Sequence, residues 1–347
     1  MTGRWRRWLI RRRLDLTVYW RSRADLDEAA RHADAALRLA GSMPAPVRAD
    51  VLIRLAHIER DRDRPRVAAG ILEQALGLLE PAEPSATRDR VLVAALAAAG
   101  DLHRRAGRYP EAQRLLEQAL RLAEDRGEPG PLTTVLTLHG IVAKELGAYQ
   151  VAARHYARVL EVHRVAGASS ADAASMAHNL AGLAHAEGRY ADAEHHARRA
   201  VSLRRRQPVE TAEDLAVLAA ALAGQGRLDE AAELLDRAMR TCREAVPPRR
   251  YELAVQTHSL ASIDQSTGRT VTAEARYREA LRLKEELLGP QHPEVALVLH
   301  NLATLLRAEG RTAQAALCWS RALPIMTATY PADHPTVQTV RTAAAGS

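Results

Sequence analysis

The 347-residue sequence contains no Phe, and aromatic residues of all kinds make up only 3% of it. Its core must therefore be built mostly from Ala and Leu, whose small and medium side chains favour helices that pack at close range. Lys and Asn are also rare, with two of each, whereas Arg is abundant. Such a preference for Arg is typical of GC-rich coding sequence, so the number of Arg residues indicates no function by itself.

Long apolar runs are missing as well. No stretch approaches the roughly 18 apolar residues of a membrane span. The basic start resembles a signal peptide, but Arg11–Arg13 and Asp15 interrupt the apolar stretch and no cleavage site follows. Cys242 and Cys318 have neither CxxC spacing nor a companion His. We therefore expect a cytoplasmic protein with two free thiols.

Motifs of catalysis are absent too. The sequence has no Walker-type glycine loop, no HExxH, no nucleophile elbow and no clustered metal ligands. His195 and His196 are adjacent, so on a helix they point about 100° apart. His178 and His185 share a helix face but lack a carboxylate or Cys one turn away. We expect no enzyme activity, no cofactor and no metal site.

The net charge of +7 is confined to one end of the chain. Residues 1–23 hold eight Arg and a single acid, Asp15, whereas the remaining residues carry 41 basic and 41 acidic side chains. The basic isoelectric point therefore does not indicate nucleic-acid binding along the whole molecule.

A short motif recurs, in which a Gly is followed five residues later by an Ala. Six copies begin at Gly107, Gly147, Gly188, Gly226, Gly268 and Gly310. Degenerate copies without the Gly extend the series toward the N-terminus. The resulting Ala residues lie 38 to 44 residues apart, at positions 29, 68, 112, 152, 193, 231, 273 and 315.

Two further small-residue positions keep the same register. Seven residues after each Ala stand residues 36, 75, 119, 159, 200, 238, 280 and 322, all Ala except for one Val. Twelve residues before it stand residues 17, 56, 100, 140, 181, 219, 261 and 303, all Ala or Gly except for one Thr. Antiparallel helices cross closely only where neither presents a bulky side chain, and the Gly supplies the turn between them. The pattern predicts eight helix pairs, at about 9–40, 47–80, 85–126, 131–166, 170–206, 210–245, 249–288 and 292–330, with a capping helix over 334–345.

These positions resemble the signature of the tetratricopeptide repeat family. The period of about 41 residues resembles the kinesin-light-chain subtype, most clearly in GPQHPE at 289–294 and HNLA at 300–303. DHPT at 333–336 repeats the entry turn, with Pro in the first turn of the coming helix. The resemblance covers essentially the whole chain, although the first two repeats lack the turn Gly. It implies an all-α, single-domain α-solenoid, a right-handed superhelix of helix-turn-helix repeats.

The first helix of each pair lines the concave groove of such a solenoid. Four residues after the small position of that helix, a row of cations occurs at Arg21, Arg60, Arg104 and Lys144, and His185 extends it. The same position holds a cation again in the last pair. Two residues before the small position, two repeats carry an Asn, which the resemblance implies contacts the main chain of a ligand. The predicted groove residues are Arg60, Arg104, Lys144, His185, Arg307, Asn179 and Asn301.

These residues predict a protein or peptide ligand, with acidic side chains or a C-terminal carboxylate as partners for the cations. We expect no small-molecule substrate. The alternative interpretation is that Arg is simply frequent and solvated at these positions.

The aromatic residues near the N-terminus admit two interpretations. The aromatic and aliphatic residues of this segment alternate with Arg, as in a helix that lies on a membrane surface; they are Trp5, Trp8, Leu9, Ile10, Leu16, Tyr19 and Trp20. Thr17, however, falls on the small position, so residues 9–22 form the first helix and the aromatics would cover the exposed end of the solenoid. We prefer the end cap, which leaves contact of the Arg cluster with nucleic acid or an anionic membrane as the weaker alternative.

The leading hypothesis for function is a scaffold or adaptor that holds a peptide or partner protein in its concave groove. The alternative is a peptide-responsive regulator, in which a ligand changes the superhelical pitch and so controls a bound effector. A third hypothesis is an accessory subunit of an enzyme.

Overall fold

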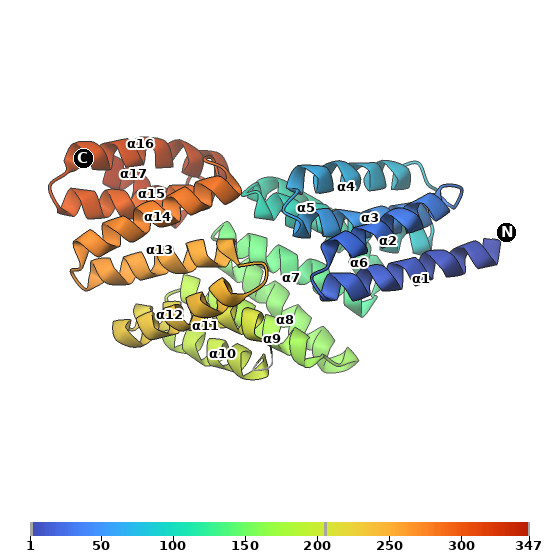
Figure 1. Ribbon diagram of the computed structural model, residues 1–347, viewed down its shortest axis with the longest axis horizontal. Coiled ribbons are helices and arrows are strands. Elements are labelled where there is room, and N and C mark those ends of the chain that lie inside the picture. The colour runs from blue at the N-terminus through green and yellow to red at the C-terminus, as the bar shows by residue number, and fades with distance from the viewer. Residues whose placement is uncertain (1–2, 205–206, 346–347) are drawn as a thin grey trace. The chain divides into compact units, whose positions relative to one another are not determined.

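The computed structural model describes residues 3–204 and 207–345, and over these residues it consists of 17 helices and no strand (Figure 1). The prediction of an all-α protein made of helix-turn-helix repeats is confirmed. The helices form eight successive hairpins and a final single helix. The hairpins are α1 (Gly3–Ser22) with α2 (Leu26–Ala40), α3 (Ala45–Asp61) with α4 (Pro65–Leu79), α5 (Ala86–Arg105) with α6 (Tyr109–Arg126), α7 (Pro129–Glu145) with α8 (Tyr149–Ala166), α9 (Ser170–Ala186) with α10 (Tyr190–Leu203), α11 (Pro208–Gly224) with α12 (Leu228–Glu244), α13 (Arg250–Ser266) with α14 (Thr270–Leu288), and α15 (Pro293–Ala308) with α16 (Thr312–Thr329), followed by α17 (Pro335–Ala345).

The helices divide into two compact units, with the division inside α7 between His139 and Gly140. The N-terminal unit contains α1 to α6 and the start of α7. The C-terminal unit contains the rest of α7 and every later helix. Each unit builds its own core, largely from Ala and Leu.

The small positions lie where the helices of a hairpin cross. The eight motif Ala residues are at most 1% exposed, and the residues seven positions later are equally buried. At Gly140, an added Cβ would lie 2.4 Å from the Tyr156 ring, and at Gly100 it would lie 2.8 Å from Cγ of Leu116. These glycines therefore make room for large side chains of the second helix, which explains why a small residue is needed there.

The turn within each hairpin has one conformation along the whole chain. The turn glycines have φ between +70° and +80°, which is the left-handed region that glycine enters without steric cost. In the first two hairpins, Ala24 (φ +59°) and Asp63 (φ +60°) adopt the same conformation, five residues before the motif Ala. The helix-turn-helix repeat therefore includes the first two hairpins, although their turns lack the Gly of the later ones.

The first helix is longer than the repeat pattern predicted. It begins at Gly3 rather than at residue 9, and Ile10 and Leu14 are the side chains that pack on Ala36 and Val51. Trp5 and Trp8 are exposed and do not cover the core as the sequence suggested, whereas Trp20 does pack against it, on the cluster that contains Ala29 and Ile58.

No helix in the described part of the chain is long and apolar enough to cross a membrane. Likewise, residues 3–204 and 207–345 contain no cluster of three or more His, Cys, Asp or Glu side chains that could hold a metal ion. Cys242 and Cys318 are free thiols, the first buried and the second half-buried.

Candidate binding face on the first helices

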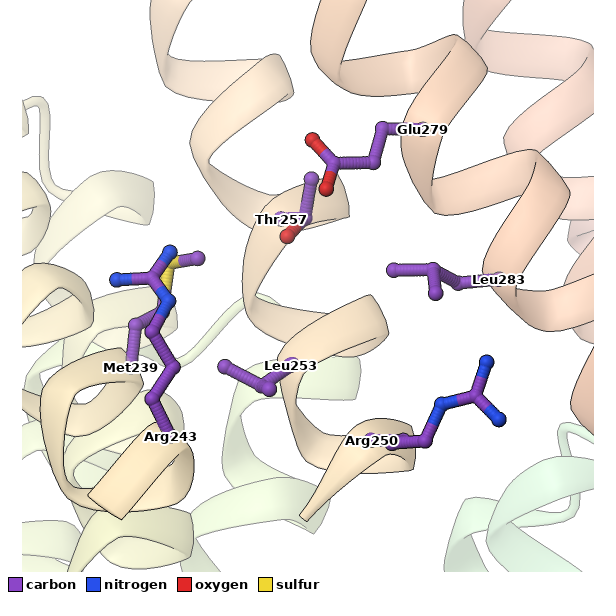
Figure 2. A pocket seen from close by; sticks show the side chains of 7 residues that line it. All are labelled: Met239, Arg243, Arg250, Leu253, Thr257, Glu279 and Leu283. Carbon is purple, nitrogen blue, oxygen red and sulfur yellow. The ribbon is translucent and has the colours of Figure 1, made fainter. Parts of the chain in front are cut away.

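A pocket opens between α12, α13 and α14 in the C-terminal unit (Figure 2). Its apolar side chains point toward one another, with Arg side chains and Glu279 around them. Its volume of about 180 Å³ is well below the few hundred Å³ of a typical ligand site. It contains none of the residues predicted from the sequence, so the surfaces of the first helices are the stronger candidate. The lining residues are Met239, Arg243, Arg250, Leu253, Thr257, Glu279 and Leu283.

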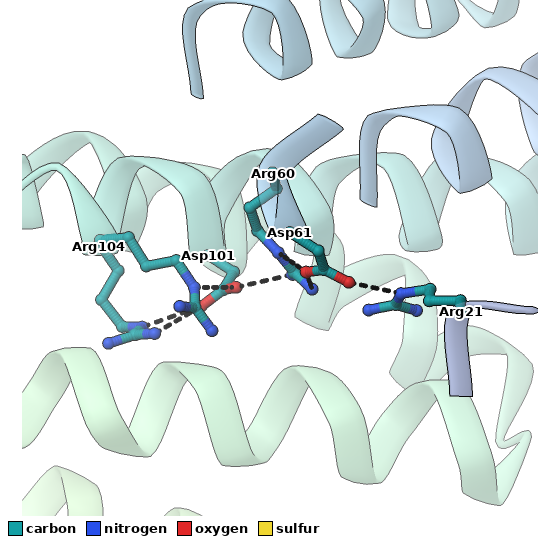
Figure 3. Close-up of polar contacts among 6 residues, drawn as sticks. Arg21, Arg60, Asp61, Asp101 and Arg104 are labelled. Carbon is teal, nitrogen blue, oxygen red and sulfur yellow. Dashed lines mark hydrogen bonds and ion pairs between the residues drawn. The ribbon is translucent and has the colours of Figure 1, made fainter. Parts of the chain in front are cut away.

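In the N-terminal unit, the predicted row of cations is joined by two carboxylates into one chain of ion pairs (Figure 3). Asp61 accepts a hydrogen bond from Arg21 of α1 at 2.5 Å and one from Arg60 at 2.9 Å. Asp101 of α5 accepts one from Arg60 of α3 at 3.2 Å and one from Arg104 at 2.7 Å. The chain therefore links α1, α3 and α5 side by side.

Asp101 is the central carboxylate of this chain and is only 7% exposed. Burial raises the pKa of its carboxyl group, but the positive charges of Arg104 and Arg105 outweigh that effect and lower the pKa to about 2. Burial also lowers the pKa of the neighbouring His57 to about 4, with a further contribution from Arg60. At neutral pH the carboxylate is therefore charged and the imidazole is neutral.

The cluster keeps an excess of positive charge in spite of these pairs. Arg21, Arg60, Arg104 and Arg105 contribute four positive charges, and Asp61 and Asp101 contribute two negative ones. The net charge is +2. We call this group of six residues the Arg–Asp ladder.

In the C-terminal unit, three predicted residues converge on the surface of α9. Lys144 reaches across from α7, and its Nζ atom lies 3.9 Å from the position that a Cβ atom of Gly182 would occupy. Asn179 precedes Gly182 by three residues and His185 follows it by three, so both share the helix face beneath the ammonium group. We call Lys144, Asn179, Gly182 and His185 the α9 cluster.

The α9 cluster has unused hydrogen-bonding capacity. The Asn179 amide is half-buried and makes no side-chain hydrogen bond to another described residue. Lys144 forms one ion pair, with its chain neighbour Glu145 at 2.8 Å. Burial lowers the pKa of His185, and the charge of Lys144 lowers it further. The imidazole is therefore neutral at neutral pH, and its ring packs against Tyr190.

The other two predicted residues of this unit are engaged within the protein. Asn301 donates a hydrogen bond from Nδ2 to His258 Nε2 at 2.8 Å, which links α15 to α13. Burial lowers the pKa of His258 to about 3, so its ring is neutral and can accept. Arg307 donates to the carbonyl oxygen of Ala343 in α17 at 3.2 Å and lies over the ring of the buried Trp319.

Asp61, Asp101 and Gly182 were not among the residues predicted from the sequence. A signal existed for the two acids, because Asp61 directly follows Arg60 and Asp101 lies three residues before Arg104, a spacing that brings side chains together on a helix. Gly182 follows the small position of α9 by one residue, and its missing side chain leaves the surface beneath Lys144 open.

The C-terminal unit also joins segments that are far apart in the sequence. His334, at the start of α17, donates a hydrogen bond from Nε2 to the carbonyl oxygen of Glu145, 189 residues earlier, at 3.1 Å. Its Nδ1 accepts from the backbone N–H of Thr336 at 3.2 Å, and its ring stacks on Tyr330. The ring lies against Gly147 in the α7–α8 turn, where an added Cβ would be 3.1 Å from His334. We call this contact the C-terminal clasp.

Comparison with known proteins gives one family and several related folds. The tetratricopeptide repeat profile matches residues 90–164, 132–206, 172–244 and 251–328, which together cover more than half of the chain. No curated protein matches the sequence.

Among the similar solved structures is BtubC (BKLC) from P. vanneervenii, with 23% identity and a TM-score of 0.51 over 62% of this chain and 89% of that one. The apo form of the quorum sensor NprR from B. thuringiensis has 14% identity and a TM-score of 0.63 over 91% of this chain and 86% of that one. NprR in complex with its cognate peptide NprX has 11% identity and a TM-score of 0.61, covering 86% of this chain and 80% of that one. At these identities the similarity shows the fold alone.

Proposed function

Because this chain belongs to the tetratricopeptide repeat family, we propose that it is an interaction scaffold that binds a peptide or an extended segment of a partner protein along its first helices. The observation that supports this most is the α9 cluster. The Asn179 amide offers a donor and an acceptor to a peptide main chain, and Gly182 allows that main chain to approach the helix closely. Lys144 would hold the segment from one side.

The Arg–Asp ladder supports an acidic ligand in the N-terminal unit. Each guanidinium group already has a carboxylate partner, so a single ion pair with a ligand would contribute little. The residual charge of +2 nevertheless attracts a negatively charged segment and speeds its encounter, an effect that salt weakens. Main-chain recognition at the α9 cluster and charge attraction at the ladder are therefore separable contributions.

The test begins with affinity capture on the intact protein and identification of the captured polypeptides by mass spectrometry. The affinity of a synthetic segment of the captured partner is then measured by fluorescence anisotropy. Asn179→Ala should weaken binding by about tenfold, because one or two main-chain hydrogen bonds are lost. Gly182→Leu should abolish it by filling the space beneath Lys144.

Two control variants separate this site from general effects. Gln291→Ala removes an exposed amide from the loop before α15 and should leave the affinity unchanged. Arg121→Gln removes an exposed positive charge from α6, the second helix of its hairpin, and should also leave the affinity unchanged. Undiminished binding by folded Gly182→Leu protein would show that another surface binds the partner.

A second candidate function is a peptide-responsive regulator that controls a bound effector. The C-terminal clasp favours it, because a contact between the first and last turns of one unit is one that a ligand can strengthen or release. The peptide complex of the similarly folded NprR is consistent with such a role. Small-angle X-ray scattering with and without the captured segment distinguishes the two, since a plain scaffold keeps its radius of gyration and a regulator changes it.

A further inference from the structure

Helix α1 has two chemically different sides. Ile10 and Leu14 are buried against α2 and α3, and Thr17 fills the small position beside them. This aliphatic side provides the packing of α1 on its neighbouring helices. The opposite side needs only to be soluble, and charged or polar residues would suffice there.

The opposite side instead exposes large aromatic rings. Trp5 is 62% exposed, Trp8 is 48% exposed and Tyr19 is 45% exposed. Trp5 and Trp8 pack edge to face with their ring centroids 5.4 Å apart, one turn from each other. A contiguous patch of large exposed apolar side chains is uncommon on the surface of a soluble protein and marks an interaction site.

Exposed positive charge flanks these rings, although Arg7, seven residues before Leu14, lies toward the aliphatic side of the helix. Five of the eight Arg residues near the N-terminus are exposed and form no ion pair with any residue in the described part of the chain: Arg4, Arg7, Arg11, Arg12 and Arg23. The other three contact Ser42, His32 and Asp61. The only acidic residue of α1 is Asp15, which is exposed on the side of Trp8, seven residues after it, and lowers the excess of positive charge there by one.

We propose that this side of α1, which we call the Trp–Arg face, docks the protein on an anionic lipid membrane. A helix that lies in the plane of a bilayer surface places Trp at the headgroup level and Arg against the lipid phosphates. The Trp–Arg face presents both along a single helix, and its positive charge complements an anionic leaflet. This surface is separate from the α9 cluster and the Arg–Asp ladder, so the proposal does not depend on the proposed function.

The arrangement of the rings favours lipid over nucleic acid. A protein that binds single strands stacks bases on open aromatic faces. Here the edge of one indole packs on the other, and the Arg12 guanidinium lies 5.4 Å from the centre of the Trp8 ring, so part of the ring surface is already in contact with the protein's own side chains. Arg23 covers Tyr19 in the same way, at 4.7 Å. Insertion into a headgroup layer requires no free ring face.

The experiment is co-sedimentation of the full-length protein with vesicles of phosphatidylcholine and phosphatidylserine at a molar ratio of about 3:1, compared with pure phosphatidylcholine. The protein should bind the anionic vesicles and not the neutral ones. Arg11→Gln with Arg12→Gln should weaken binding by about thirtyfold, since two surface charges are removed. Trp5→Ala with Trp8→Ala should weaken it by at least about tenfold and should keep the residual binding salt-sensitive.

A matched variant, Arg121→Gln with Arg240→Gln, removes two exposed charges from α6 and α12 and should bind as the unmodified protein does. The proposal is overturned if the protein ignores anionic vesicles, or if this control loses binding as much as the α1 variants do. It is also overturned if a fluorescently labelled DNA oligonucleotide binds through the same Arg residues while the vesicles do not, which would assign the face to nucleic acid.

Discussion

At the scale of single residues, two hairpin turns contain a residue that is poorly suited to the backbone conformation it adopts. Ala24 and Asp63 occupy the left-handed conformation that Gly occupies in the later turns. Replacing Ala24 with Gly should therefore stabilise the protein by about 0.5–1 kcal/mol, because the steric cost of a Cβ in that region is removed. Asp63→Gly should act in the same direction. Urea unfolding followed by circular dichroism measures the change.

Two Gly→Ala substitutions elsewhere serve as controls, and they should change the stability in opposite directions. Gly107→Ala should destabilise the protein by about 1 kcal/mol, because it places a Cβ at φ +70°. Gly70 lies inside α4 with nothing within 4 Å of an added Cβ, so Gly70→Ala should stabilise that helix by up to about 1 kcal/mol. If Ala24→Gly and Gly107→Ala shift stability in the same direction, the two turns are not equivalent.

The close helix crossings permit a second prediction at this scale. Ala193 and Ala273 are fully buried where the helices of their hairpins cross. Replacing either with Leu should cost about 1–3 kcal/mol, because the larger side chain forces the helices apart. Val271, on the same helix as Ala273, is 82% exposed, and Val271→Leu should change the melting temperature little. Equal melting of all three variants would contradict the assigned register.

At the scale of the helix, the Arg–Asp ladder makes the packing of α3 and α5 depend on pH. Asp101 has a folded-state pKa of about 2, below its usual 3.8. A carboxyl group with a lowered pKa stabilises the folded state above its unfolded pKa, and this contribution disappears as the pH falls through the folded pKa. Asp101→Asn should therefore cost about 2 kcal/mol at neutral pH.

The difference between this variant and the unmodified protein should shrink as the pH falls from about 4 to about 2, since the native Asp101 then becomes protonated as well. Urea titrations across that range test it. Arg31→Gln, which removes an exposed i,i+3 ion pair with Glu28 within α2, serves as the control and should change stability by less than about 1 kcal/mol. A difference for Asp101→Asn that stays constant with pH would show that burial, not charge, determines its effect.

Helices and their order were predictable because each crossing requires a small residue and the crossings recur with a fixed period. The neighbouring placement of Arg60 on α3 and Arg104 on α5 follows from the same spacing. That Arg60 contacts Asp101 does not follow, because the two residues lie on different helices, α3 and α5, and their contact depends on how these helices are placed side by side. The binding role of the predicted residues therefore remains a prediction, refined by the open amide of Asn179 and the engaged amide of Asn301.

At the scale of the whole molecule, the C-terminal clasp gives a test that local repeats do not. Gly147→Ala adds a Cβ at φ +76° and 3.1 Å from the His334 ring, whereas Gly226→Ala adds one at φ +80° with nothing within 4 Å. Both variants should lose about 1 kcal/mol through backbone strain. Only Gly147→Ala should also loosen α17, which hydrogen exchange would detect as faster exchange of its amides.

Equal exchange in the two variants would mean that the clasp contributes nothing to holding α17. Such a contact could not be predicted from the sequence. The repeat pattern specifies only how each helix meets its neighbours, and small rotations at each crossing add up over α8 and the four hairpins that separate Glu145 from His334. The division of the chain inside α7 is equally invisible in the pattern, which continues through Gly140 without interruption.

The C-terminal clasp also affects the order in which contacts form while the chain is being synthesised. Hairpins join residues close in sequence, so each can form as it leaves the ribosome, whereas the Glu145 carbonyl must wait for His334, 189 residues later. At typical synthesis speeds that delay is roughly 10 to 40 s. During this interval the α7–α8 turn of the nascent chain is complete but lacks its contact with His334, so the Glu145 carbonyl and Gly147 are open to other molecules until synthesis reaches α17.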